Sequence, residues 1–198
     1  MENKYDFKLD GIGKIQGGVY KNLDVDGVTT IVGNIEAENI DIDGCVKSKG
    51  NIKCKNIKLD GLYRGNGYIE ASERVTINGC PRINGDIQGK EIVIDGKVKV
   101  RGLVTGDKVL LTLSGKNYIT EIGGEEVSVN AYGYVFWSKP LLTSDSIEAD
   151  TINISNTNCK VVRGNDIRIS RGCNIDRVEY TGTLKVDDRA RVKEIVKL

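Results

Sequence analysis

Residues 33–61 read GNIEAENIDIDGCVKSKGNIKCKNIKLDG and contain one pattern twice. Each unit begins with Gly-Asn-Ile, at Gly33 and again at Gly50, and each ends with an alternating aliphatic pair and Asp-Gly, at Gly44 and Gly61. The alternation of apolar and polar residues predicts strands with one buried face, and the Asp-Gly dipeptides predict turns. The two units are 17 residues apart, and this interval decides the fold.

The unit recurs along most of the chain. Asp-Gly and Asn-Gly dipeptides follow one another at intervals of 16, 17, 17, 18 and 17 residues, and their glycines are Gly11, Gly27, Gly44, Gly61, Gly79 and Gly96. A second column consists of Gly17, Gly33, Gly50, Gly67, Gly85 and Gly102. Alternating aliphatic pairs keep the same interval from Leu23/Val25 to Val127/Val129 and resume with Ile152/Ile154. A fixed interval of this kind indicates a solenoid, in which like residues of successive turns stack.

These columns predict an all-β fold, a single-stranded β-helix with about 17 residues per turn. One turn buries four or five aliphatic side chains, about 1.5–3 kcal/mol each. Fixing the backbone of one turn costs about 1–2 kcal/mol per residue, so turns are stable only when stacked. The expected buried positions advance by 5, 2, 4 and 6 residues; they are Ile35, Ile40, Ile42, Val46 and Ile52. A left-handed hexapeptide helix would keep a strict step of six, so we expect a right-handed, triangular coil.

The domain organisation follows from where the repeat is regular. We expect a short N-terminal segment over residues 1–10 and one continuous β-helix over residues 11–198. Residues 130–146 break the interval, because Val127 and Ile152 are 25 residues apart. This irregular insertion holds Tyr132, Tyr134, Phe136 and Trp137. It is either a partner-binding loop or an irregular turn that packs its rings against the coil.

Composition bounds the function classes. Lys and Arg number 29 against 28 Asp and Glu, so the overall charge does not favour nucleic acid or an anionic membrane. The N-terminus lacks the apolar segment of a signal peptide, and no stretch is long enough to span a membrane. Five cysteines without a C-x-x-C pair are expected to be reduced thiols, which indicates the cytoplasm.

Catalysis is not expected. The chain contains no histidine, so Ser-His-Asp and Cys-His arrangements and the usual zinc ligands are excluded. The glycines recur at turns, and none belongs to a nucleotide-binding fingerprint. We therefore predict no catalytic residue, no metal site and no cofactor.

Two charged columns accompany the turns. The acidic column consists of Asp10, Asp26, Asp43, Asp60, Asn78 and Asp95, each before a glycine. It is either a row of Ca²⁺ sites or, as we favour, a row of side chains that cap the backbone of their own turns. The basic column lies three residues after each glycine, at Lys14, Thr30, Lys47, Arg64, Arg82 and Lys99. It is expected to neutralise the acidic column, and binding of a polyanion or lipid surface is the less favoured alternative.

The stretch from Gly33 to Gly44, with its continuation from Gly50 to Gly61, resembles the bactofilins. The resemblance is clearest over residues 11–104, where the rhythm G-x-I-x-A…I-x-I-x-G repeats. It implies a right-handed β-helix that belongs to a bacterial cytoskeleton and polymerises end to end without nucleotide. The Pro-rich tails of that family are missing, so membrane association stays open.

The ends of the coil carry the functional prediction, since uncapped strands at a solenoid end can pair with another copy. The chain is expected to end on a strand; a short helical cap with Val192, Ile195 and Val196 on one face is the competing interpretation. Candidate assembly residues are Ile12, Ile15, Val19, Val192, Ile195, Val196 and Leu198. We expect a self-associating scaffold whose partners are other copies and cell-envelope or morphogenesis proteins, not nucleic acid. The alternative is a monomeric β-helix that binds a protein or a cell-wall polymer.

Overall fold

The structure is a computed structural model that describes residues 4–131 and 141–198. Within these residues the chain forms one 13-stranded sheet and no helix. The strands are β1 (Tyr5–Lys49), β2 (Ile52–Asn66), β3 (Ile69–Gly79), β4 (Arg82–Asn84), β5 (Ile87–Gln88), β6 (Glu91–Gly96), β7 (Lys99–Leu113), β8 (Lys116–Ala131), β9 (Leu141–Ile154), β10 (Thr157–Ile169), β11 (Asn174–Tyr180), β12 (Leu184–Val186) and β13 (Arg191–Lys197).

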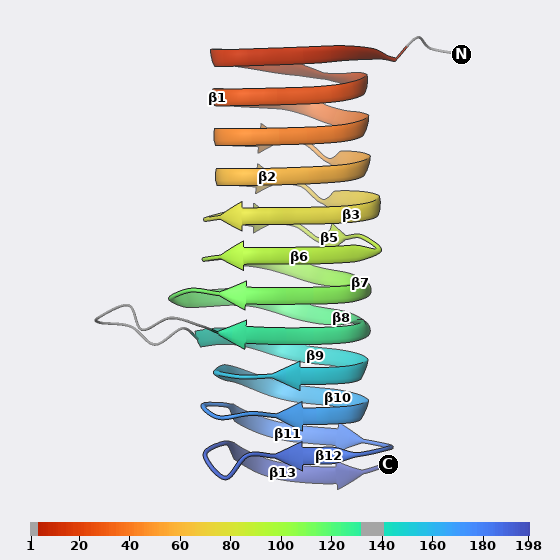
Figure 1. The fold of residues 1–198 in the computed structure, drawn as a ribbon, viewed down its shortest axis with the longest axis vertical. Coiled ribbons are helices and arrows are strands. Elements are labelled where there is room, and N and C mark those ends of the chain that lie inside the picture. Colours follow the sequence, from red (N-terminus) through yellow and green to blue (C-terminus); the bar gives the residue numbers. More distant parts are fainter. Residues whose placement is uncertain (1–3, 132–140) are drawn as a thin grey trace.

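The sheet is wound into a parallel β-solenoid with about 17 residues per turn, which confirms the predicted fold (Figure 1). Every strand pair is parallel, and like residues of successive turns lie in register. One inward column consists of Ile40, Ile57, Val75, Ile92, Val109, Val127, Ile152, Ile167 and Leu184. Stacking of this kind gives each backbone its hydrogen-bond partners in the turns above and below.

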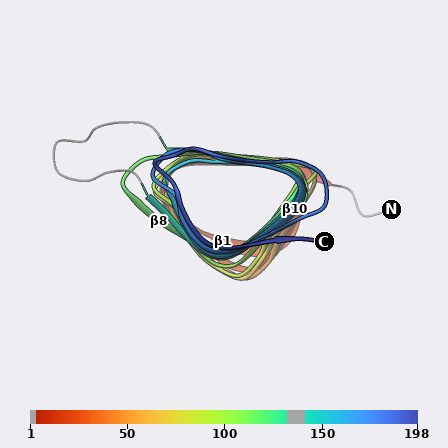
Figure 2. The same ribbon diagram turned by 90° about the horizontal axis from the view of Figure 1, so that it is seen from below.

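The coil is right-handed and triangular. Viewed along its axis, the turns superimpose as a three-sided outline (Figure 2). In Figure 1 the near strands run from right to left and the far strands from left to right as the chain descends, which is a right-handed path. Right-handed crossovers are the general rule for parallel strands.

The core is one continuous aliphatic column inside the triangle. The five positions expected to be buried each expose 3% or less of their surface; they are Ile35, Ile40, Ile42, Val46 and Ile52. β-branched side chains dominate because they fit the pleated surface of a strand. The alternation of buried and exposed residues along β2 and β3 therefore reports which side of the wall each residue faces.

The first glycine column forms one corner of the triangle. Gly27 and Gly44 have φ angles of +126° and +120°, a region that L-residues rarely adopt. A Cβ on Gly27 would also overlap the carbonyl oxygen of Gly11, and one on Gly44 would overlap that of Gly27. These corners thus need glycine both for the turn and for the close approach of the next backbone.

The coil continues across the interruption in the repeat. Val127 of β8 pairs with Ile152 of β9, although they are 25 residues apart in the chain. Their neighbours Val129 and Ile154 are also partners. The extra residues therefore leave the inward columns unshifted.

The C-terminal segment is a strand, so the helical cap considered above is wrong. β13 runs from Arg191 to Lys197 and pairs with β11. Ile175 and Val178 of β11 specify the register by holding Val192 and Ile195 opposite them. The spacing of three between Val192 and Ile195 thus repeats the spacing of Ile175 and Val178 in β11, and it is not a helical period.

Candidate functional site

The C-terminal end exposes side chains that belong to the core columns. Ile195 is opposite Val178, yet Ile195 exposes 52% of its surface and Val178 none. Val186 of β12 likewise continues the column of Ile169 and is 38% exposed, against 1% for Ile169. Exposed aliphatic surface at the end of a solenoid is what a further turn would cover.

The backbone at this end also has a free edge. Among the described residues, β13 is hydrogen-bonded to β11 alone, and β12 to β10 alone. The outer N–H and C=O groups of both strands therefore lack a strand partner within the part of the chain that the structure describes. Such an edge is a template for another strand.

Three aromatic rings cluster at the N-terminal end. Tyr20 packs edge-on against Tyr5, with ring centroids 5.3 Å apart, and lies 5.7 Å from Phe7. Tyr20 is 4% exposed, and its hydroxyl donates a 2.8 Å hydrogen bond to the carbonyl oxygen of Gln16. Burial raises the pKa of this hydroxyl. Tyr5 remains 55% exposed, so this end presents partly apolar surface.

The structure places the predicted assembly residues in different settings. Val192 and Ile195 lie on core columns at the C-terminal end, and Leu198 lies beside them, 65% exposed. Ile15 is buried in the core, whereas Ile12 is 89% exposed at a corner. Val19 and Val196 are half-buried. Their part in assembly stays a prediction.

Sequence reasoning missed several residues of the two ends. They are Tyr5, Phe7 and Tyr20 at the N-terminal end, and Leu184 and Val186 at the C-terminal end. Leu184 and Val186 could have been found, because their aliphatic pair is the last in its column. The candidate partner-binding residues Tyr132, Tyr134, Phe136 and Trp137 lie outside the described residues.

The acidic column lies along the first glycine corner. Within the described residues, no backbone N–H of its own turn donates a hydrogen bond to a carboxylate of this column, so the expected local caps do not form. Asp60 accepts a 2.7 Å hydrogen bond from the Asn78 amide and pairs with Lys58 at 2.6 Å. These contacts lower the pKa of Asp60, with the Lys58 hydrogen bond as the main cause. No group of three or more His, Cys, Asp or Glu that could hold a metal occurs in the residues the structure describes.

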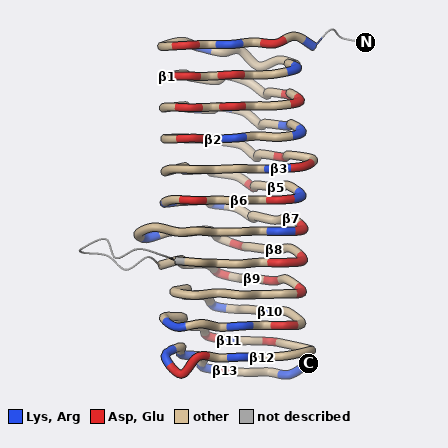
Figure 3. Tube along the Cα trace, in the orientation of Figure 1, with Lys and Arg blue, Asp and Glu red and all other residues tan. Residues whose placement is uncertain are grey.

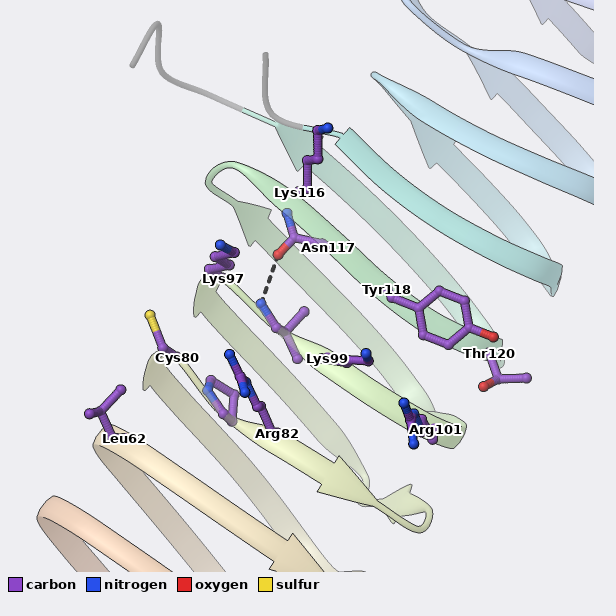
Figure 4. A pocket seen from close by; sticks show the side chains of 12 residues that line it. Leu62, Cys80, Arg82, Lys97, Lys99, Arg101, Lys116, Asn117, Tyr118 and Thr120 are labelled. Atoms are coloured by element: carbon purple, nitrogen blue, oxygen red, sulfur yellow. Dashed lines mark hydrogen bonds between the residues drawn. The ribbon is translucent and has the colours of Figure 1, made fainter. Parts of the chain in front are cut away.

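The basic column lies on the next face of the triangle. Lys47, Arg64, Arg82 and Lys99 are register partners in successive turns. A groove of about 960 Å³ runs beside its C-terminal half, lined by Arg82, Lys97, Lys99, Arg101 and Lys116 among others (Figure 4). Asn117 shapes the groove, because its buried oxygen accepts a 2.7 Å hydrogen bond from the Val98 N–H. No carboxylate lines this groove.

A charge ladder fastens the last turns to each other. Glu179 is 8% exposed and accepts hydrogen bonds of 2.6 Å from both Arg163 and Arg177. Arg177 also donates to Glu194 of β13 at 2.9 Å. The Arg163 and Arg177 hydrogen bonds lower the pKa of Glu179. The ladder holds the C-terminal end in place.

The cysteines are poor candidates for a nucleophile. Burial raises the pKa of Cys54 and Cys159 to about 12 and that of Cys173 to about 11, so they are thiols at neutral pH. Cys45 and Cys80 are exposed on the corner, two turns apart.

The residues that the structure describes contain no helix long and apolar enough to cross a membrane.

Comparison with known proteins agrees with this architecture. A family model described as "Bactofilin: Polymer-forming cytoskeletal" matches residues 1–105. The matched region covers the turns in which the repeat is most regular. No solved structure matches the chain.

Two curated relatives come from Bacillus subtilis (strain 168). The uncharacterized protein YhbE is 37% identical over 103 residues, which are 49% of this chain and 44% of YhbE. The uncharacterized protein YhbF is 34% identical over 99 residues, which are 49% of this chain and 42% of YhbF. The matches thus span less than half of the length of either relative.

Proposed function

The chain belongs to the bactofilin family, and on that premise we propose that it is a scaffold protein whose β-helices join end to end without nucleotide. Membership of the bactofilin family and the solenoid fold together support a polymer-forming cytoskeletal role. The open β-helix termini supply the contact in this proposal. Other copies of the chain are the first partner, and cell-envelope or morphogenesis proteins are the further partners we expect.

The observation that carries the proposal is the exposure of Ile195 in a column whose other members are buried. Burying the exposed half of such a side chain against another copy contributes about 1 kcal/mol. Val186 and Leu198 add further apolar area at the same end. Several such contacts and a new row of backbone hydrogen bonds are needed to offset the loss of rotational and translational freedom.

The two ends suit repeated stacking. One end presents the edge of β13 with aliphatic side chains, and the other presents Tyr5 and the edge of β1. Strands of two copies would then lie about 4.8 Å apart, as they do within one coil. Contacts between unlike ends do not close and give an open filament.

A structural role also accounts for what the side chains do. The alternating aliphatics fill the core, the glycines form corners, and most charged residues face outward. No histidine is present, and three of the five thiols have raised pKa values. We therefore infer a protein of the cytoplasm that binds no cofactor and catalyses no reaction.

Negative-stain electron microscopy of the pure protein without nucleotide tests the proposal. We expect filaments, and we expect the double variant Val192→Lys/Ile195→Lys to give short rods, because it places two charges on the C-terminal core surface. Val161→Lys is the matched control, since Val161 is half-buried on β10 and lies two turns inside the C-terminal end, where β11 and β13 stack on it.

Sedimentation velocity gives the same answer in solution. The unmodified protein and the Val161→Lys control should sediment as large species that shift with concentration. Monodisperse monomers of the unmodified protein at all salt and protein concentrations would refute end-to-end assembly. They would favour the monomeric binding module instead.

A further inference from the structure

We propose that two copies of this chain also associate side by side, with the acidic face of one copy against the basic face of the other. The acidic face comprises residues 6–10, 22–26, 39–43 and 56–60. The basic face comprises residues 12–16, 28–32, 45–49, 62–66, 80–84, 97–101 and 116–120. This contact is lateral and uses no residue of the C-terminal end.

The basic face carries charge of one sign. Its seven segments contain nine Lys or Arg and no Asp or Glu. None of these nine cations forms an ion pair with another described residue. They are Lys14, Lys47, Lys49, Arg64, Arg82, Lys97, Lys99, Arg101 and Lys116. A patch of this kind repels itself until an anionic partner covers it.

The acidic face carries the opposite charge. Its four segments contain seven Asp and two Lys. Figure 3 shows these carboxylates along the near strands of the first turns. Lys8 and Lys58 pair with four of them, but Asp26 and Asp43 form no ion pair within the described residues. The face therefore keeps a net negative charge.

The two faces have the same spacing. Asp43 and Asp60 are register partners one turn apart, and so are Lys47 and Arg64. Both columns thus repeat once per strand spacing, about 4.8 Å. When two rods lie parallel, the carboxylates of up to four successive turns can meet cations at the same spacing without bending either rod.

A second copy of the chain can neutralise both faces, because it carries an acidic and a basic face itself. Other anionic partners can neutralise the basic face alone. A bilayer or a flexible polyanion would cover the basic face and leave the acidic face unmatched. A flexible polymer would also lose conformational freedom on binding, which a second rigid rod does not. Because the contact joins two different faces, it can repeat and place many rods side by side.

The test uses sedimentation velocity with the end-blocked Val192→Lys/Ile195→Lys protein, in which only lateral contacts remain. We expect side-by-side assemblies of two or more rods at about 50 mM NaCl that separate into single rods at about 500 mM, since salt screens exposed charges. A basic-face variant, Lys47→Glu/Arg64→Glu/Arg82→Glu, should pair at least about tenfold more weakly. An acidic-face variant, Asp24→Lys/Asp26→Lys/Asp41→Lys, should show the same loss.

Mixing the two variants should restore pairing, because one retains the acidic face and the other the basic face. The matched control is Lys21→Glu/Lys55→Glu/Lys90→Glu, which changes the charge equally on exposed residues of neither face and should pair normally. Glutamine and asparagine versions of both variants repeat the test if circular dichroism shows that reversal perturbs the fold.

The proposal is overturned if the basic-face variant pairs as well as the control, or if mixing does not restore pairing. It is also overturned if lateral association of the end-blocked protein does not change with NaCl concentration while polyphosphate or anionic vesicles bind the basic face. That result would assign the basic face to another ligand. Failure of end-to-end stacking would instead shorten filaments of the unblocked protein and leave this result unchanged.

Discussion

The side-chain amide of Asn39 donates a 2.9 Å hydrogen bond to the side-chain oxygen of Asn22, one turn earlier in the coil. The amide of Asn56 donates in the same way to Asn39 at 3.1 Å, and that of Asn22 to Asp6 at 2.8 Å. The result is a polar ladder on the outside of the wall. It links the first turns on their outer surface, whereas the aliphatic columns link them on the inside.

Replacing Asn39 should therefore weaken the coil. Asn39→Ala removes one donated and one accepted hydrogen bond, both exposed, and we expect a loss of about 1 kcal/mol in the free energy of unfolding. Urea unfolding followed by circular dichroism measures it. Lys55→Ala, at an exposed position with no ion pair to a described residue, is the control and should change stability by less than about 0.5 kcal/mol. An Asn39→Ala protein as stable as this control would show that the ladder contributes nothing.

The corner glycines should be intolerant of a methyl group. Gly44→Ala combines a φ of +120° with an overlap on the Gly27 carbonyl, so we expect a loss of about 2 kcal/mol or more. Gly123→Ala is the matched control, because its new Cβ would meet its nearest neighbour, the Thr105 hydroxyl oxygen, at 3.5 Å, an ordinary contact. Thermal unfolding of both variants gives the comparison. Equal melting temperatures would contradict the assigned role of the corner.

The core column can be used to separate folding from assembly. Val178→Ala opens a cavity in the closed part of the column, and we expect a loss of about 1–3 kcal/mol in monomer stability. Ile195→Ala should cost the monomer clearly less, since half of that side chain is exposed. In the polymer, where Ile195 would be covered, its loss should raise the concentration at which filaments form. Light scattering across a dilution series measures this, and unchanged assembly would argue against burial of Ile195 between copies.

Much of the coil was predictable because one interval fixes everything that depends on register. The 17-residue step placed Ile40 on Ile57, and the aliphatic pair that resumes after the interruption placed Ile152 in the column of Val127; the structure confirms both stacks. The corner also turns the chain, so Asp43 and Lys47 lie on different faces although they are four residues apart. The expected neutralisation of one column by the other overlooked this change of direction.

The ends were less predictable, because a repeat specifies only residues that have a neighbour on both sides. Tyr20 belongs to the first turn, and its contacts with Tyr5 and Phe7 join side chains that no column of the repeat specifies. Asn117 is similar, since it accepts a hydrogen bond from the Val98 N–H across 19 residues and donates to the carbonyl oxygens of Ser114 and Gly115, outside the regular 17-residue columns. Such contacts follow from three-dimensional packing and leave no periodic signal.

Acid should loosen the C-terminal end through Glu179. The pKa of this carboxyl is lowered in the folded protein, so its stabilising effect is complete above the ordinary pKa of 4.5 and is lost as the pH falls through the lowered value. The protection of the β11 and β13 amides, measured as the exchange rate relative to the intrinsic rate at each pH, should therefore decrease below about pH 4.5. Glu179→Gln should remove most of this dependence and expose both strands already at neutral pH. Glu125→Gln, at an exposed position, should leave the profile unchanged. An identical profile for Glu179→Gln would show that another group controls the end.

The five thiols should divide into two classes toward an alkylating reagent. Cys45 and Cys80 are exposed, so iodoacetamide at pH 7.5 should modify both in the folded protein within minutes to hours. Cys54, Cys159 and Cys173 have raised pKa values because of burial, and they should react only after unfolding in guanidinium chloride. Mass spectrometry of peptides counts the labels at each position. Since Cys45 and Cys80 lie at the corner between the acidic and basic faces, lateral pairing should slow their labelling at low salt and not at high salt. Rapid labelling of Cys159 in the folded protein would contradict the closed core from which the register of the last turns follows.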